Sequence, residues 1–359
     1  MLKPIRRVAC LPALAACQQL MQRLALWLCD HQVSSVSVTQ ANLRANMGSA
    51  IEGDWLWHLL AGTSGTKALL DKAKRIADLP PADKTGLQQW IQAVNALAQH
   101  FGPTPPAALT VNPPNGWGSR DERWTTFKAL MVAFYEEGLR GGLPYAPNGG
   151  PTTDAALRVS YDQFLQAFRA AHRLDPHPDA REICVLCGGP LVLPAVDHWL
   201  AKTAFPLLSV CADNLLPTCG ECNSTQNKGQ KDVHTGGTFT DWFHPYLRHA
   251  NGAIRPHYDD AALGVRVESA TPADAVKVQN LDRLLNLGQR WTREFKAEYR
   301  RLQREAQRRQ ISNVQALQQR LMEYRQDLSA AEPHHEIHAL LAEALLDPAR
   351  LQAFAQITP

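Results

Sequence analysis

Apolar residues recur at helical spacing through most of the chain, on both sides of a central segment that lacks this pattern. In the N-terminal part, stripes with a period of three to four residues predict helices within residues 8–28, 42–100, 121–139 and 153–172. Two stretches rich in proline and glycine, at 102–119 and 141–151, cannot continue a helix and are predicted to be loops.

The C-terminal part returns to the helical pattern. Residues 271–328 carry two apolar stripes, which predict one long helix or a helical hairpin. One or two short helices are predicted around Pro348. The fold class expected is therefore mainly α, with helical N- and C-terminal regions flanking a small central module.

The central module contains two closely spaced cysteine pairs. Cys184 with Cys187, and Cys219 with Cys222, each form a Cys-x-x-Cys pair. Two such turns that approach each other supply four thiolates, the ligand set of a structural Zn²⁺ site. The alternative is four unrelated buried or redox-active cysteines.

Between the pairs, an apolar and partly β-branched run over 191–196 predicts a strand that continues into Asp197 and His198. Thr218 is a suitable N-cap for a helix that carries the second cysteine pair and Asn223. The predicted order is zinc knuckle, strand, irregular loop, strand and helix.

The cysteines, the Asp197-His198 pair, Asn214 and Asn223 together resemble the motif of HNH endonucleases, in the form where four cysteines hold a structural zinc beneath a ββα-metal site. The resemblance is confined to residues 183–231. It implies that His198 is the general base, that Asp197 and Asn223 are metal ligands, and that Asn214 braces the loop and orients the base. The third motif position, often histidine in that family, is Asn223 here, and an amide oxygen suits Mg²⁺ or Mn²⁺.

Phosphodiester hydrolysis requires an activated water on one side of phosphorus and a charge sink for the leaving oxygen on the other. An imidazole with an ordinary pKa of about 6.5 is mostly neutral at pH 7 and can accept the proton of the water. A divalent cation supplies the charge sink. By itself an Asp-His pair is usually a surface feature, so the interpretation depends on the flanking cysteines and asparagines.

The length and composition of the chain indicate its domain organisation and the origin of any nucleic-acid affinity. With 359 residues, 45% hydrophobic and 20% charged, the chain is expected to form a 1–175 helical domain, a 180–235 HNH module and a 236–359 aromatic cap with a helical C-terminal region. A net charge of +3 requires any nucleic-acid affinity to come from local clusters. The remaining cysteines lie among apolar residues and are predicted to be buried free thiols of a cytoplasmic protein: Cys10, Cys17, Cys29 and Cys211.

Basic residues outnumber acidic ones between Arg283 and Arg309. One interpretation is a solvated helix face with ion pairs one turn apart; the other is a clamp for the backbone of duplex DNA. The residues predicted to contact nucleic acid are Lys228, Lys231, Arg300, Arg301 and Arg304. The aromatic cluster of residues 239–246 is predicted to cap the module, with base stacking as the alternative.

The N-terminus has basic residues before an apolar run, as secretory signals do, but the run contains Pro12 and continues with helical periodicity, so a core helix is predicted. The stretch GTSGTK at 62–67 lacks the full spacing of a phosphate loop and is predicted to be a turn. No segment is long and apolar enough to span a membrane.

These features predict a metal-dependent endonuclease acting on DNA, with a defence or mobile-element setting and an ATPase or sensor partner suggested by analogy. The alternatives are a non-catalytic zinc module that binds nucleic acid or protein, and a nuclease directed at RNA.

Overall fold

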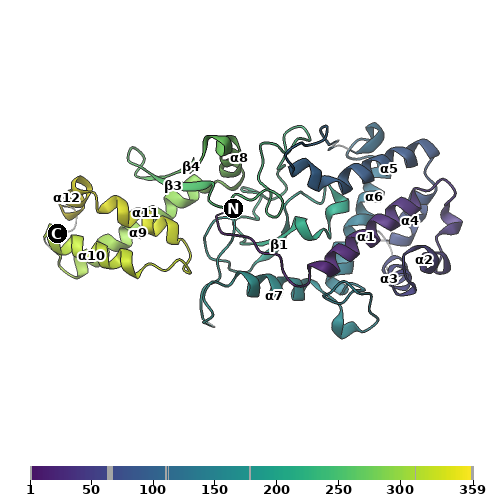
Figure 1. Cartoon of the computed structure of the whole chain (residues 1–359), viewed down its shortest axis with the longest axis horizontal. Coiled ribbons are helices and arrows are strands. Elements are labelled where there is room, and N and C mark those ends of the chain that lie inside the picture. The colour runs from purple at the N-terminus through teal and green to yellow at the C-terminus, as the bar shows by residue number, and fades with distance from the viewer. Residues whose placement is uncertain are drawn as a thin grey trace.

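A computed structural model describes residues 2–62, 68–109, 111, 113–177, 179–311 and 313–356. The chain is mainly helical and has two small antiparallel sheets. In Figure 1 the N-terminal helices gather at one end, the yellow-green C-terminal helices at the other, and the N-terminus lies between them. The turn predicted at 62–67 falls largely on residues 63–67, which are outside the described residues.

The N-terminal helices are α1 (Leu11–Leu28), α2 (Gln40–Asn46), α3 (Ala50–Ala61), α4 (Leu69–Ala77), α5 (Pro81–Asn95), α6 (Glu122–Ala133) and α7 (Tyr161–His172). Helix α1 is a core helix, as predicted: Leu14, Leu20 and Leu24 are fully buried. Side-chain caps fix several helix starts, because Thr39, Ser49 and Ser160 each accept a backbone N–H of the first turn.

Helix α6 continues directly into a π-helix, η5 (Phe134–Leu139). Its one glycine, Gly138, packs against Trp55, and a Cβ at this position would lie 3.0 Å from the Trp55 ring. The wider turn directs Tyr135 and Glu136 toward the central module. π-Helical turns are rare and are frequent at functional sites.

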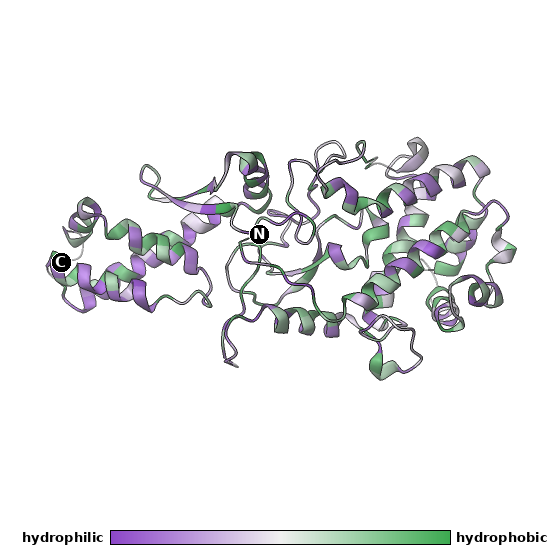
Figure 2. Cartoon of the chain, in the orientation of Figure 1, coloured by the Kyte–Doolittle hydropathy of each residue, from purple (hydrophilic) through white to green (hydrophobic). Residues whose placement is uncertain are grey.

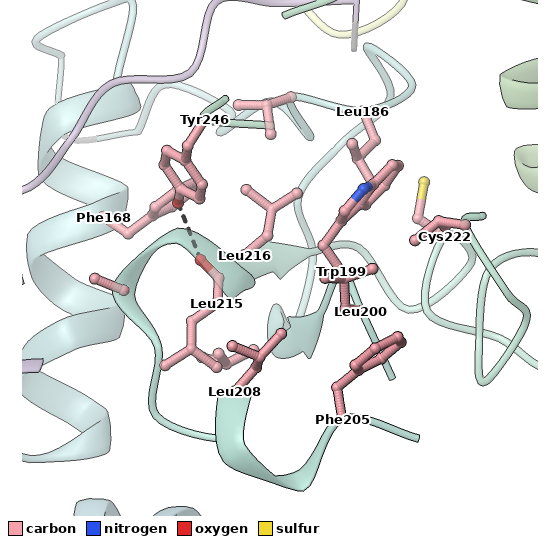
Figure 3. Close-up of a cluster of buried hydrophobic side chains, with 14 of the residues drawn as sticks. Phe168, Leu186, Trp199, Leu200, Phe205, Leu208, Leu215, Leu216, Cys222 and Tyr246 are labelled. Atoms are coloured by element: carbon pink, nitrogen blue, oxygen red, sulfur yellow. Dashed lines mark hydrogen bonds between the residues drawn. The ribbon is translucent and has the colours of Figure 1, made fainter. Parts of the chain in front are cut away.

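The central hairpin consists of β1 (Ala195–His198) and β2 (Leu215–Thr218), paired antiparallel with Asp197 opposite Leu216 and His198 opposite Leu215. Its apolar side chains pack with Phe168 of α7 and with Tyr246, whose hydroxyl donates to the Leu215 carbonyl at 3.0 Å (Figure 3). The aromatic side chains of the 239–246 segment are buried.

The prediction of a helix after Thr218 is wrong. Residues 219–234 form turns and irregular backbone, and the Asn223 N–H to Cys219 carbonyl bond is the one with α-helical spacing at the start of this segment. The Cys222 N–H faces the Cys219 sulfur at 3.4 Å, and the Asn227 amide donates to the Glu221 carbonyl. These side-chain bonds compete with the helical ladder, so the helix does not propagate.

The C-terminal region begins with a hairpin of β3 (Ile254–Asp259) and β4 (Gly264–Ser269), which the sequence pattern did not predict. Helices α8 (Ala275–Leu285) and α9 (Leu287–Arg308) follow, separated by Asn286 in the left-handed conformation at φ 55°. Helices α10 (Val314–Asp327), α11 (His335–Leu345) and α12 (Pro348–Gln356) complete the chain. The segment predicted as one long helix or a helical hairpin divides into three helices, α8, α9 and α10, and the Tyr324 hydroxyl of α10 donates to Glu298 of α9 at 2.6 Å. In Figure 2 these helices alternate hydrophilic and hydrophobic residues along their length, as helices with one buried face do.

Candidate functional site

Four buried cysteines form a candidate metal centre. The sulfur atoms of Cys184, Cys187, Cys219 and Cys222 all lie within 4.8 Å of one another. The Cys184–Cys222 and Cys187–Cys219 sulfur pairs are both 3.9 Å apart. A tetrahedral zinc shell with Zn–S bonds of about 2.3 Å has S–S edges of about 3.8 Å, so the four sulfurs fit this metal.

Each cysteine turn also supplies backbone donors to sulfur. The Gly189 N–H points to the Cys187 sulfur and the Cys222 N–H to the Cys219 sulfur, each at 3.4 Å. Gly188 has a φ of 74°, which closes the first turn in a conformation that favours glycine. Hydrogen bonds among the four sulfurs lower the pKa of Cys184 and Cys219 and raise that of Cys187 and Cys222, so protons are shared within the cluster. The backbone donors stabilise thiolates, the form that binds metal.

Helix α9 contributes two side chains to the cysteine cluster that sequence reasoning did not foresee. The Arg290 guanidinium lies 3.3 Å from the Cys222 sulfur and forms an ion pair with Glu221 at 3.2 Å. The Trp291 indole N–H donates to the Cys187 carbonyl at 3.0 Å. Four thiolates and one Zn²⁺ carry a net charge of −2, which the Arg290 cation partly offsets.

On the hairpin, His198 is held in one orientation. Its Nε2 lies 2.9 Å from the Ser209 carbonyl oxygen. Because a carbonyl can only accept, Nε2 carries the proton and Nδ1 is left with its lone pair. His198 is only 6% exposed, and burial lowers its pKa to about 3. The imidazole is therefore neutral at pH 7.

The N-terminal region covers this histidine. The Tyr135 ring lies 4.5 Å from the His198 ring, between centroids, at an angle of 73°. The Tyr135 hydroxyl donates to the Val196 carbonyl at 3.2 Å, and Lys202 donates to Glu136. Thus η5 is attached to both strand β1 and the loop that follows it.

Asp197 is paired with a buried lysine. The Lys228 Nζ lies 3.0 Å from Asp197 Oδ2 and donates to the His198 carbonyl at 2.6 Å. Burial raises the pKa of Asp197 and lowers that of Lys228, and the opposite charge of the partner opposes both shifts. Lys228 is fully buried. The prediction that Lys228 contacts nucleic acid is therefore corrected: its ammonium lies in the module interior, where it neutralises Asp197.

Asn214 joins the two ends of the loop between β1 and β2. Its Oδ1 accepts the Leu200 N–H at 2.7 Å, and its Nδ2 donates to the carbonyls of Leu200 and Leu208. The loop it closes includes Ser209, which contacts His198. Any part that Asn214 takes in catalysis stays a prediction.

The other predicted site residues lie apart from these contacts. Among the described residues, no hydrogen bond of the Asn223 side chain is found, and its amide is half-buried. Lys231 is exposed and donates to the Gln226 carbonyl. Arg300 and Arg304 are exposed on α9, whereas Arg301 is paired with Glu298 and Glu305.

Of the remaining cysteines, Cys10, Cys17 and Cys29 are buried and Cys211 is half-buried, all as free thiols. Burial raises the pKa of Cys29 to about 12 and that of Cys211 to about 11, so these thiols are protonated at pH 7. Within the described ranges, no helix has the length and apolar character needed to cross a membrane.

No family model matches the chain, and no curated protein or solved structure is significantly similar to it. The likeness to HNH endonucleases therefore rests on the residues of the 183–231 segment alone.

Proposed function

We propose that the chain is a metal-dependent endonuclease of the HNH type that hydrolyses phosphodiester bonds in DNA. The observation that carries the proposal is the contact between His198 Nε2 and the Ser209 carbonyl, because it leaves the Nδ1 lone pair as a proton acceptor. The cysteine cluster and Asn214 hold the hairpin on which these residues lie.

In the proposed reaction a water oxygen attacks phosphorus and its proton passes to His198 Nδ1. The P–O bond to the leaving oxygen then breaks. A Mg²⁺ or Mn²⁺ ion, when bound, stabilises the charge on that oxygen. The Ser209 carbonyl keeps the imidazole in the tautomer that accepts the proton, and it also stabilises the imidazolium that forms.

The donors expected to hold the cation are the Asp197 carboxylate and the Asn223 amide, both hard oxygen ligands. Their chemistry fits such an ion. In this structure, however, the Lys228 ammonium lies against the carboxylate, and Tyr135 covers the histidine. Cation and substrate must therefore displace Lys228 and Tyr135, which makes this arrangement a closed form of the proposed enzyme.

The proposal is tested by cleavage of plasmid DNA and of single-stranded DNA with added Mg²⁺ or Mn²⁺, comparing wild type with His198→Ala. Loss of a general base lowers the rate by roughly 10²–10⁴-fold. The matched control is His249→Ala, since His249 is exposed and lies outside the hairpin. Zinc content and circular dichroism are measured on the same preparations. A folded, zinc-loaded His198→Ala protein that cuts at the wild-type rate rules out the mechanism.

The second candidate is a non-catalytic zinc module, and one observation favours it. The Asp197–Lys228 pair is buried and complete without any added cation. In such a module Asp197→Ala, His198→Ala and Asn223→Ala leave nucleic-acid or protein binding unchanged. In the nuclease, Asp197→Ala and Asn223→Ala lose cleavage through the cation, so high Mn²⁺ restores part of it, but not in His198→Ala.

A further inference from the structure

One face of α9 carries a row of cations that lack acidic partners. Four basic side chains recur every fourth residue and are exposed: Lys296, Arg300, Arg304 and Arg308. Successive members are about 6 Å apart along the helix axis, so the row is about 18 Å long. In the described part of the chain, none of the four forms an ion pair or a hydrogen bond.

Other arginines of this helix form ion pairs with glutamates of the same chain. Arg301 pairs with Glu298 at 2.6 Å and with Glu305 at 3.3 Å, and Arg309 pairs with Glu305 at 3.2 Å. The solvated-face interpretation of the sequence thus describes Arg301 and Arg309. The four residues of the row keep uncompensated charge, which attracts a polyanion.

The row begins at an aromatic cavity. A cavity of about 420 Å³ lies between α9, α11 and the β3–β4 hairpin, and Lys296 and Arg300 are among its lining residues. Tyr258 and Phe295 stack in its wall with centroids 5.5 Å apart and planes at 30°. Tyr299 lines it as well. Cavities of this size hold small organic ligands.

The geometry points to a binding site for single-stranded nucleic acid, with a base in the aromatic cavity and the phosphates along Lys296, Arg300, Arg304 and Arg308. A cationic track beside aromatic platforms is how proteins bind unpaired strands, because the phosphates meet charge and each exposed base face can stack. A duplex keeps its bases stacked inside, so it can contact the row but cannot fill the cavity.

The position of the row links this site to the central module. Arg290, six residues before Lys296 on the same helix, contacts the Cys222 sulfur. The row therefore starts about 9 Å along the helix from the cysteine cluster. A single nucleic-acid strand bound to this row therefore extends toward the module that carries His198. The inference specifies the substrate of the proposed nuclease, and binding tests it independently of cleavage.

Fluorescence anisotropy with a labelled single-stranded DNA of about 12 nucleotides measures the binding, at several salt concentrations and without divalent cations. Each phosphate contact to a single strand contributes about 0.7 to the slope of log K against log salt. Arg300→Gln with Arg304→Gln should therefore lower the slope by about 1.4. The matched control, Arg120→Gln with Arg325→Gln, removes the same charge from exposed positions outside the row and should leave the slope unchanged.

The cavity is tested with Tyr299→Leu, which removes the ring, and Tyr299→Phe, which keeps it. Loss of one stacked base weakens binding about tenfold, while the slope stays that of wild type. Tyr299→Phe should bind as wild type. A single-stranded RNA of the same sequence distinguishes the two sugars, and a duplex DNA should bind more weakly than the single strand.

An unchanged slope in the Arg300→Gln, Arg304→Gln protein overturns the inference. So does duplex DNA that binds as tightly as the single strand and is insensitive to Tyr299→Leu, because the row would then be a clamp for duplexes. If binding behaves as expected while His198→Ala retains cleavage, the binding site stands and the proposed mechanism alone fails.

Discussion

The Tyr135 ring stands edge-on to the His198 imidazole, with the two centroids 4.5 Å apart. The tyrosine belongs to a π-helix of the N-terminal region, and the histidine ends strand β1 of the central hairpin. One residue of the helical region thus excludes water from the proposed base. The environment of His198 depends on how these two parts of the chain are docked.

Replacing Tyr135 should change the pKa of His198. Tyr135→Ala admits water to the imidazole, so the pKa rises from about 3 toward the ordinary value of about 6.5. Proton NMR titration of the His198 ring measures the shift. Tyr135→Phe is the control, because it keeps the ring and loses only the hydrogen bond to Val196. A pKa that stays low in a folded Tyr135→Ala protein would show that other groups bury the histidine.

Removing the buried lysine should destabilise the module. Lys228→Met leaves the Asp197 carboxylate buried without a counter-charge, which lowers the free energy of unfolding by about 3–5 kcal/mol. Urea denaturation measures the loss. Adding Asp197→Asn to Lys228→Met removes the unpaired charge and should restore most of the stability. Equal stability of the single and double variants would mean that Asp197 takes up a proton once Lys228 is removed.

Mg²⁺ provides a second readout for the Lys228→Met protein. With the ammonium gone, the proposed cation can bind Asp197, so Mg²⁺ should raise the unfolding midpoint of this variant more than that of wild type. The double variant lacks the carboxylate and should not respond. A similar response in both variants would place the bound cation elsewhere.

Metal removal should release α9 from the central module. Chelation of zinc, or Cys222→Ser, removes the thiolate cluster that Arg290 and Trp291 contact, so the hairpin loses its fold and α9 its anchor. Limited proteolysis and Trp fluorescence should both report the change. Arg290→Gln should weaken zinc retention against a chelator, whereas Arg308→Gln, at an exposed position farther along the same helix, should change it little. Chelated protein that resists protease as the native protein does would contradict this coupling.

Acid should destabilise the fold progressively from pH 6.5 down to about pH 3. His198 and His244 are buried, and burial lowers the pKa of each to about 3. Below pH 6.5 the unfolded chain binds protons that the folded chain does not, so stability falls as the pH falls. Each residue contributes up to about 1.4 kcal/mol per pH unit. Denaturation of His244→Asn at matched zinc occupancy should show a shallower slope than wild type, and the exposed His249→Asn should not.

Long periodic segments were predictable from the sequence because one buried face repeats over many turns. Helices α1 and α9 are of this kind, and the four cysteines were predictable from their spacing. The break between α8 and α9 at Asn286 was not predictable, because a single left-handed residue leaves the apolar stripe intact. The β3–β4 hairpin was missed because its turn has Leu263 at a φ of 47° in place of a glycine pair.

The sequence also could not predict which arginines of α9 are buried and which are exposed. Arg290 and Arg300 belong to the same helix, yet one is buried against sulfur and the other is exposed. Only the packing of α9 on the cysteine cluster separates them. Lys228 was misassigned for the same reason, because its carboxylate partner is thirty-one residues away.

The turn at residues 184–187, called the knuckle here, binds two distant parts of the chain, the N-terminal segment and helix α9. The backbone N–H groups of Leu2 and Lys3 donate to the carbonyls of Leu186 and Val185, while Trp291 donates to that of Cys187, 104 residues away. During synthesis the N-terminal segment cannot make these hydrogen bonds until the knuckle has been synthesised. The knuckle in turn cannot make its contact with Trp291 until α9 has been synthesised. We therefore expect the N-terminal helices to form first and the knuckle to close late, since contacts between distant residues form slowly. A ribosome that pauses before residue 291 would hold a chain whose thiols are still open to oxidation.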